Sequence, residues 1–158
     1  MKRRTNGNKA PRWGRAWPWL TVLAVYAVIS WFSTQPGDVS DAQTMLVQDL
    51  MGNQSEWFAI IVRKLAHVSL FLFQGAACCF AWLRHDAGKS PLHGRYRRAV
   101  WRSIALCALL GGLDEFHQLF VAGRAALVSD MLLDTLGAAL GALCLAGLAR
   151  RLERRKAA

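Results

Sequence analysis

The chain has 158 residues, of which 54% are hydrophobic, and it carries a formal net charge of +10. This combination favours a small integral membrane protein over a soluble basic domain. Binding to nucleic acid is the competing explanation of the positive charge. The positions of the basic residues relative to the apolar segments decide between the two explanations.

Four apolar segments follow one another along the chain, and together they leave little room for a separate soluble domain. Each is long enough to cross the hydrocarbon core of a bilayer, which needs about 17–25 helical residues. We therefore predict an all-α integral membrane protein whose four transmembrane helices form an antiparallel bundle. The predicted helices span about residues 17–34, 58–83, 101–121 and 128–149.

The basic residues predict the orientation of this membrane domain, residues 17–149. Most of the 20 Lys and Arg residues lie in the N-terminal tail, 1–16, in the loop between the second and third segments, and in the C-terminal tail, 150–158. The loop after the first segment, 35–57, has none and carries acidic residues instead. By the positive-inside rule, both termini face the cytoplasm. The charge is then mainly a topology signal that can also contact anionic lipids, and we expect no binding to nucleic acid.

The four cysteines lie inside predicted helices and show no C-x-x-C spacing, so the sequence indicates neither a disulfide framework nor a zinc site. We expect no metal or other cofactor, and we interpret the cysteines as small packing residues. They are Cys78, Cys79, Cys107 and Cys144.

Hydrophilic side chains that remain within the predicted spans gather in one half of the membrane. The predicted topology places those of the second, third and fourth helices, and of the outer turn before the fourth, in the outer half. Ionisable residues inside spans are functional candidates by default. The candidates are Lys64 and His67 in the second helix, Asp114, Glu115 and Gln118 in the third, Arg124 in the turn, and Asp130 and Asp134 in the fourth.

Helical spacing predicts which faces carry these groups. In the fourth helix, Asp130 and Asp134 share a face with Gly137 and Gly141, a small-xxx-small pair that lets a neighbouring helix approach closely. The two aspartates repel each other at this spacing unless a cation or a proton intervenes. Lys64 and Arg124 are the best candidates for that cation, and Arg63 is expected to reach the outer interface.

Three sequence motifs also resemble the VanZ-like family of small bacterial membrane proteins. They are "STQPG" at 33–37, "KLAHVSLF" at 64–71 and "LDEFHQLFVAGRAALVSDMLLDTLGAALG" at 113–141. The resemblance implies a multi-pass protein of the bacterial cytoplasmic membrane. The founding member is associated with teicoplanin resistance, so a link to glycopeptide resistance is an expectation. Phe71 departs from the Tyr that the family often has, which removes one hydroxyl from the site. The motif positions here are Lys64, His67, Asp114, Glu115, Gln118, Arg124, Asp130 and Asp134.

Two functional hypotheses follow from the cluster. In the first, it binds the polar head of an envelope lipid, a lipid-linked cell-wall precursor or a lipoglycopeptide, with Lys64 and Arg124 holding a phosphate or carboxylate. In the second, the protein is an intramembrane lipid-modifying hydrolase or transferase. His67 or Glu115 would then act as general base, and Asp134 as acid or metal ligand.

Other interpretations stay open at this point. The sequence offers no evident nucleophile, because Ser69 and Ser129 stand in no triad context, and this weakens the enzyme hypothesis. The cluster could instead be an ion-pair network that fixes helix register. An ion-coupled carrier would need a path that four helices rarely enclose alone, so a homo-oligomer would have to supply it.

Overall fold

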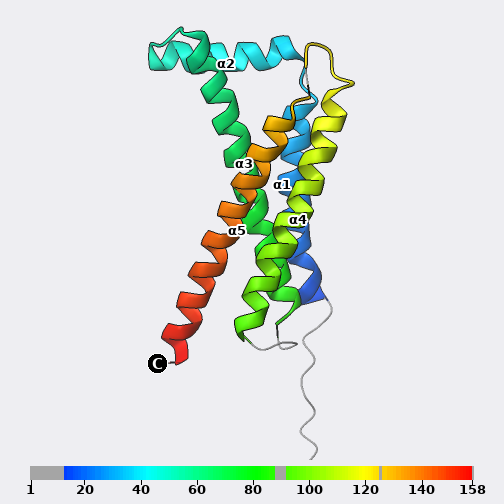
Figure 1. The fold of residues 1–158 in the computed structure, drawn as a ribbon, viewed down its shortest axis with the longest axis vertical. Coiled ribbons are helices and arrows are strands. Elements are labelled where there is room, and N and C mark those ends of the chain that lie inside the picture. Colours follow the sequence, from blue (N-terminus) through cyan, green and yellow to red (C-terminus); the bar gives the residue numbers. More distant parts are fainter. Residues whose placement is uncertain (1–12, 88–91, 125, 158) are drawn as a thin grey trace, which may run out of the picture.

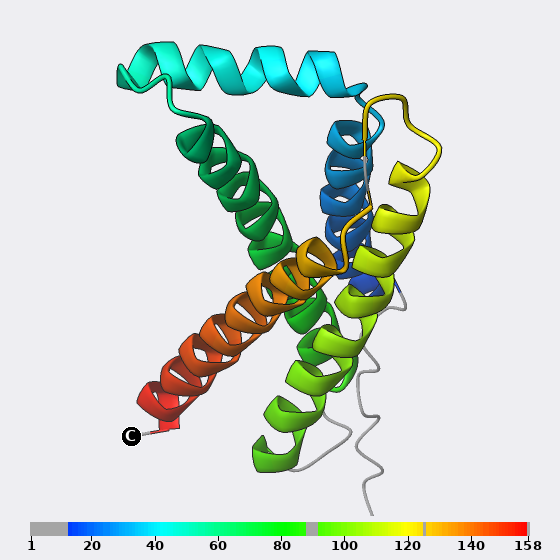
Figure 2. The ribbon, with the colours of Figure 1, turned by 45° about the horizontal axis from the view of Figure 1, so that its top comes forward.

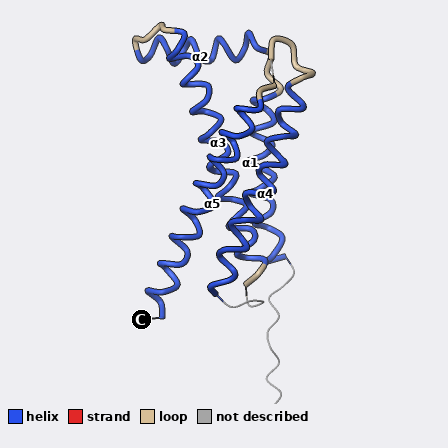
Figure 3. The backbone as a smooth tube through the Cα atoms, viewed as in Figure 1, coloured by secondary structure: helices blue, strands red, loops and turns tan. Residues whose placement is uncertain are grey.

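A computed structural model describes residues 13–87, 92–124 and 126–157, and these residues form five helices joined by short loops (Figure 3). Within these ranges the chain has no strand, so the prediction of an all-α protein is confirmed. Most of the predicted N-terminal basic tail lies outside the described residues. The helices are α1 (Trp13–Ser33), α2 (Gly37–Met51), α3 (Glu56–His85), α4 (Leu92–Gln118) and α5 (Val128–Ala157).

Three helices of the described part of the chain are long and apolar enough to cross a membrane. The apolar stretches are Ala16–Ser33 in α1, Glu56–His85 in α3 and Val128–Lys156 in α5. The fourth predicted span lies in α4, which carries arginines in its first half and two acids near its end. The chain is therefore a helical membrane protein, and a fourth crossing by α4 stays a prediction.

The helix α2 was not predicted, and the assignment of residues 35–57 to a loop is wrong. Figure 1 shows α2 lying across one end of the bundle that the other helices form. Its buried stripe is Gly37, Ser40, Thr44 and Gln48, so its small and polar side chains face the protein. Apolar residues such as Leu46 lie exposed on its other side. The helix ends at Gly52, whose φ of 66° places it in the left-handed region that favours glycine.

All four predicted helices extend beyond their predicted bounds at one end or at both, and α5 continues through most of the predicted C-terminal tail to Ala157. A cap at Ser55, whose hydroxyl accepts a hydrogen bond from the backbone N–H of Phe58 at 3.3 Å, lets α3 begin at Glu56. The helix α4 begins at Leu92 instead of near residue 101. Hydropathy marks only the part of a helix that matches the hydrocarbon core, so polar turns that continue beyond it escape detection.

Close packing of α3 against α5 forms the most extensive interface in the bundle. The two helices cross in Figure 2, and glycines at the crossing bring their backbones together. A Cβ atom on Gly137 would meet the carbonyl oxygen of Val68, and one on Gly141 would meet that of Leu72. A Cβ atom on Gly75 of α3 would likewise meet the carbonyl oxygen of Ala138. The prediction that Gly137 and Gly141 admit a neighbouring helix is thus confirmed.

The core between these helices is built from small and apolar side chains. Phe71 is fully buried, as are Cys78, Cys79 and Cys107, which confirms their predicted packing role. Cys144 differs, because it lies exposed on α5.

Candidate functional site

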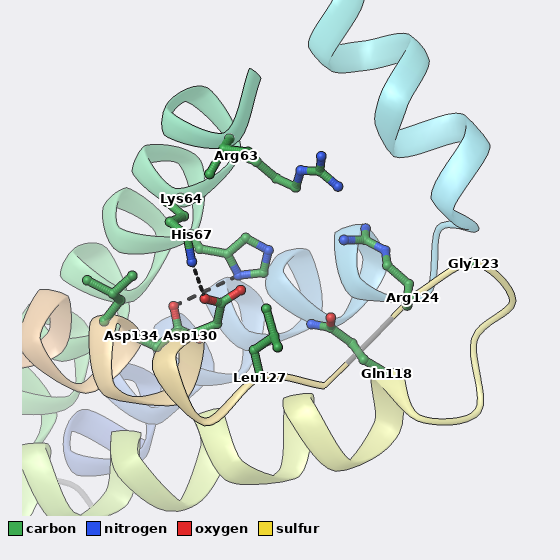
Figure 4. A pocket seen from close by; sticks show the side chains of 11 residues that line it. Arg63, Lys64, His67, Gln118, Gly123, Arg124, Leu127, Asp130 and Asp134 are labelled. Atoms are coloured by element: carbon green, nitrogen blue, oxygen red, sulfur yellow. Dashed lines mark hydrogen bonds and ion pairs between the residues drawn. The ribbon is translucent and has the colours of Figure 1, made fainter. Parts of the chain in front are cut away.

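A cavity of about 360 Å³ lies at the end of the bundle that α2 covers, between α3, the start of α5 and the loop before it (Figure 4). Six of the eight residues proposed from the sequence line it, from three separate segments of the chain. The structure thus brings these six residues together at one end of the bundle. The lining residues are Ile60, Arg63, Lys64, His67, Gln118, Gly123, Arg124, Leu127, Asp130, Leu133 and Asp134.

Lys64 and Asp130 form the clearest ion pair of this cavity. The Lys64 ammonium nitrogen lies 2.5 Å from the Asp130 carboxylate, which also accepts a hydrogen bond from the Ser129 hydroxyl at 3.1 Å. Asp130 stands in the first turn of α5, where the helix dipole also favours a negative charge. The predicted role of Lys64 as a cation beside Asp130 therefore fits this position, and the helix start favours the same negative charge.

Asp134 and His67 face each other within the cavity wall without a direct hydrogen bond. Nδ1 of His67 is 3.9 Å from Oδ1 of Asp134, which is too long for one. Asp134 has an exposed fraction of 0%, and neither of its carboxylate oxygens has a hydrogen-bond partner among the described residues. Buried polar groups in proteins are nearly always paired. Asp134 therefore offers two unused acceptor atoms at the cavity.

Arg124, in the loop before α5, places a cation in the wall of the same cavity. Its guanidinium donates hydrogen bonds to the backbone carbonyls of Gln35 at 3.2 Å and Phe32 at 3.3 Å, which ties the loop before α5 to the end of α1. It forms no ion pair with any described residue. Burial, and next the nearby charge of Arg63, lower the pKa of Arg124. Arg124 is thus a partly buried cation whose charge the protein does not fully compensate.

Arg63 lines the cavity as well, although the sequence suggested only a residue at the outer interface. It forms an ion pair of 3.4 Å with Asp41 of α2, and both side chains are partly exposed. Asp41 was not a candidate, because the helix that carries it had not been predicted. Figure 4 shows the guanidinium groups of Arg63 and Arg124 turned toward the same space beside the His67 ring.

Two proposed site residues, Asp114 and Glu115, do not line the cavity, and the protein itself satisfies them. Asp114 accepts hydrogen bonds from the Ser33 hydroxyl at 2.7 Å and from the Gln118 amide at 3.0 Å. Glu115 accepts one from the backbone N–H of Leu127 at 2.7 Å, just before α5 begins. These acids brace α4 against α1 and against the start of α5.

Ser33, the partner of Asp114, was not singled out from the sequence, although a signal existed. It is the first residue of the motif "STQPG", which the sequence offered only as a mark of resemblance. Its hydroxyl could be recognised as a partner of Asp114 only once α1 and α4 were known to lie together. His117, by contrast, is exposed on α4 and does not line the cavity.

Comparison with known proteins identifies one family. The sequence model described as VanZ/LLP1 matches residues 18–150, a range that includes every residue lining the cavity. No curated protein and no solved structure matches the chain significantly.

Proposed function

The chain belongs to the VanZ/LLP1 family, and we propose that it binds the polar head of an envelope lipid or a lipid-linked cell-wall precursor. The observation that carries the proposal is the pairing of two uncompensated groups in one cavity. Arg124 is a cation without an ion-pair partner among the described residues, and Asp134 is a buried carboxylate without a hydrogen-bond donor there. A head group with an anionic group and with hydroxyl, amide or ammonium donors would satisfy both.

The proposed topology places this cavity in the outer half of the bacterial cytoplasmic membrane. In it α1, α3, α4 and α5 all cross the bilayer, and both termini lie in the cytoplasm. The distribution of Lys and Arg supports this orientation, because the loop side that contains α2 has no basic residue between Gln35 and Trp57. The exposed apolar side of α2 suits a helix that lies along the outer membrane surface.

The family resemblance extends the proposal to antibiotic resistance of the teicoplanin type. A protein that holds a lipid-linked cell-wall precursor or a lipoglycopeptide at the outer surface would change how such an antibiotic meets its target.

A second candidate function is an intramembrane hydrolase or transferase acting on such a lipid. The observation that favours it is the position of His67 beside the buried carboxylate of Asp134 in the cavity. An imidazole next to a carboxylate can act in general acid–base catalysis. Glu115 fits the role of base less well, because it does not line the cavity and accepts a hydrogen bond from the chain itself.

Native mass spectrometry of the protein purified in a mild detergent tests the binding proposal. We expect the wild type to retain an amphiphile that carries an anionic group, and Arg124→Gln to lose it. Arg151→Gln, which removes an exposed arginine far along α5, is the matched control and should retain it. A wild type free of any such amphiphile, or equal retention by both variants, would contradict the proposal.

A further inference from the structure

A second cavity adjoins the first on the side of α2. It has a volume of about 370 Å³, and it shares Arg63, His67 and Arg124 with the polar cavity. Both volumes fall within the range of about 300–1,000 Å³ that is typical of ligand pockets. The two cavities therefore adjoin at the side chains that both of them share.

The second cavity has a different chemical character from the first. The side chains that it does not share are all uncharged, and five of them are apolar: Phe32 of α1, Val47 of α2, and Val62, Ala66 and Leu70 of α3. The other four are polar: Ser40, Gln43 and Thr44 of α2, and Ser69 of α3. It contains no carboxylate, whereas two line the polar cavity. Apolar surface of this kind is stabilised when it is covered by another apolar group. The apolar part of this lining fits a hydrocarbon chain, and the absence of a carboxylate distinguishes it from the polar cavity.

The second cavity is also accessible from the outside of the protein. Gln43, Ala66 and Ser69 in its lining are exposed. Above it lies α2, which is fixed at both ends. The N–H of Gly37 donates to the carbonyl of Ala122 at 3.1 Å, and the side chain of Gln48 donates to the carbonyl of Ser55 at 3.1 Å. The helix α2 thus covers the second cavity, which lies between α1 and α3.

The boundary between the two cavities carries the groups that best bind phosphate. A guanidinium presents a planar fork of N–H donors that matches the oxygens of a phosphate. Arg63 is held from above by Asp41, and Arg124 is held by the carbonyls of Phe32 and Gln35. Each guanidinium group therefore has partners that orient it at the junction, and Figure 4 shows that the two are turned toward one space.

We infer that the two cavities form one continuous site for a phosphate-bearing amphiphile. The phosphate lies between Arg63 and Arg124, and the hydrocarbon chain lies in the second cavity beneath α2. The rest of the head group extends into the polar cavity toward Asp134. This inference rests on the proposed function, because it names the chemical class of the bound lipid. It also assigns the phosphate, the hydrocarbon chain and the rest of the head group to separate parts of the two cavities.

Dodecyl phosphate is the simplest probe of this arrangement, and inorganic phosphate is its counterpart without a chain. We would measure the binding of both to the full-length protein in a neutral maltoside detergent. Ala66→Phe and Val47→Trp fill the second cavity from α3 and from α2. Ala42→Phe, on an exposed position of α2 outside the cavity lining, is the matched control.

We expect the wild type to bind dodecyl phosphate at least tenfold more tightly than inorganic phosphate. Each cavity-filling variant should lose most of that difference while its affinity for inorganic phosphate stays the same, and Ala42→Phe should behave as the wild type. Two independent filling variants keep the test valid if one of them fails to fold.

The outcomes separate the inference from the proposed function. Dodecyl phosphate affinity that both filling variants leave unchanged, together with a loss in Arg124→Gln, would overturn the placement of the chain and leave head-group binding intact. No effect of Arg124→Gln on either probe would overturn both. Equal wild-type affinity for the two probes would overturn the chain site alone.

Discussion

The hydroxyl of Ser33 donates a hydrogen bond of 2.7 Å to the carboxylate of Asp114, which lies 81 residues further along the chain. This bond joins α1 to α4 and, together with the amide of Gln118, satisfies one oxygen of a buried acid. Asp134, only a short distance along the chain, has no such partner among the described residues. Among the described residues, the fold thus satisfies the buried acid Asp114 and leaves the buried acid Asp134 available.

The first prediction follows from the role of Ser33 as a brace. Ser33→Ala removes a hydrogen bond to a buried carboxylate, and we expect the free energy of unfolding in mixed micelles to fall by about 1.5–3 kcal/mol. Thr34→Ala is the control, because Thr34 is exposed and its hydroxyl bonds only to the carbonyl of Trp31. Loss of lipid binding in Ser33→Ala without loss of stability would instead place Asp114 in the binding site.

Packing between α3 and α5 supports a second prediction. Gly141→Ala places a methyl group against the carbonyl of Leu72, and we expect the strain to lower the unfolding free energy by about 1–3 kcal/mol. The same change at Gly147, where nothing lies within 4 Å, should raise it by up to about 1 kcal/mol. Equal effects of the two substitutions on thermal unfolding would show that α3 and α5 do not pack closely at Gly141.

The third prediction separates a binding site from a purely structural network. Lys64→Asp and Asp130→Lys each leave like charges facing one another, and the double variant restores an ion pair with reversed order. We expect the double variant to recover stability, with a coupling energy of about 0.5–3 kcal/mol, but not lipid binding. Recovery of both properties would favour the network over the ligand.

The fourth prediction separates binding from catalysis at His67. His67→Gln keeps a hydrogen-bond donor of similar reach without a ring that titrates. We expect this variant to keep much of the lipid binding and a proportional share of any cellular phenotype. Loss of a general base costs about 10²- to 10⁴-fold in rate. Intact binding with complete loss of phenotype, at normal expression, would therefore favour the enzyme.

Orientation is open to a direct test by cysteine labelling. In a background without the four native cysteines, a cysteine at Asn53, an exposed position in the α2 to α3 turn, should react with an impermeant thiol reagent on intact cells. One at Arg151, at the other end of the bundle, should be protected until the cells are opened. The reverse pattern would place the cavity at the cytoplasmic side.

Much of this arrangement could be predicted from the sequence because periodicity and charge report on single helices. The placement of Lys64 and His67 in one helix and the glycine face of α5 are each properties of a single helix, and both were predicted. Which residues pair with one another across different helices could not be predicted from the sequence. Lys64 meets Asp130 and not Asp134, because the relative position of α3 and α5 depends on backbone contacts at the glycines.

The helix α2 shows a different limit. Its apolar residues, among them Val39, Leu46 and Leu50, recur at helical spacing, but they are too few for a membrane span and were assigned to a loop. Because this helix was not predicted, the ion pair between Asp41 and Arg63 and the position of Arg63 in the cavity lining were not predicted either. A short amphipathic segment between two spans is therefore a candidate for a helix that lies along the membrane interface.

The most direct test of the central claim is an experimental structure of the protein in nanodiscs formed from its own membrane lipids, with a bound antibody fragment. We predict non-protein density that bridges Arg124 and Asp134 and continues beneath α2. A cavity without such density, in which the Arg124 guanidinium instead pairs directly with a carboxylate of the protein, would contradict the claim that this site binds a lipid head group.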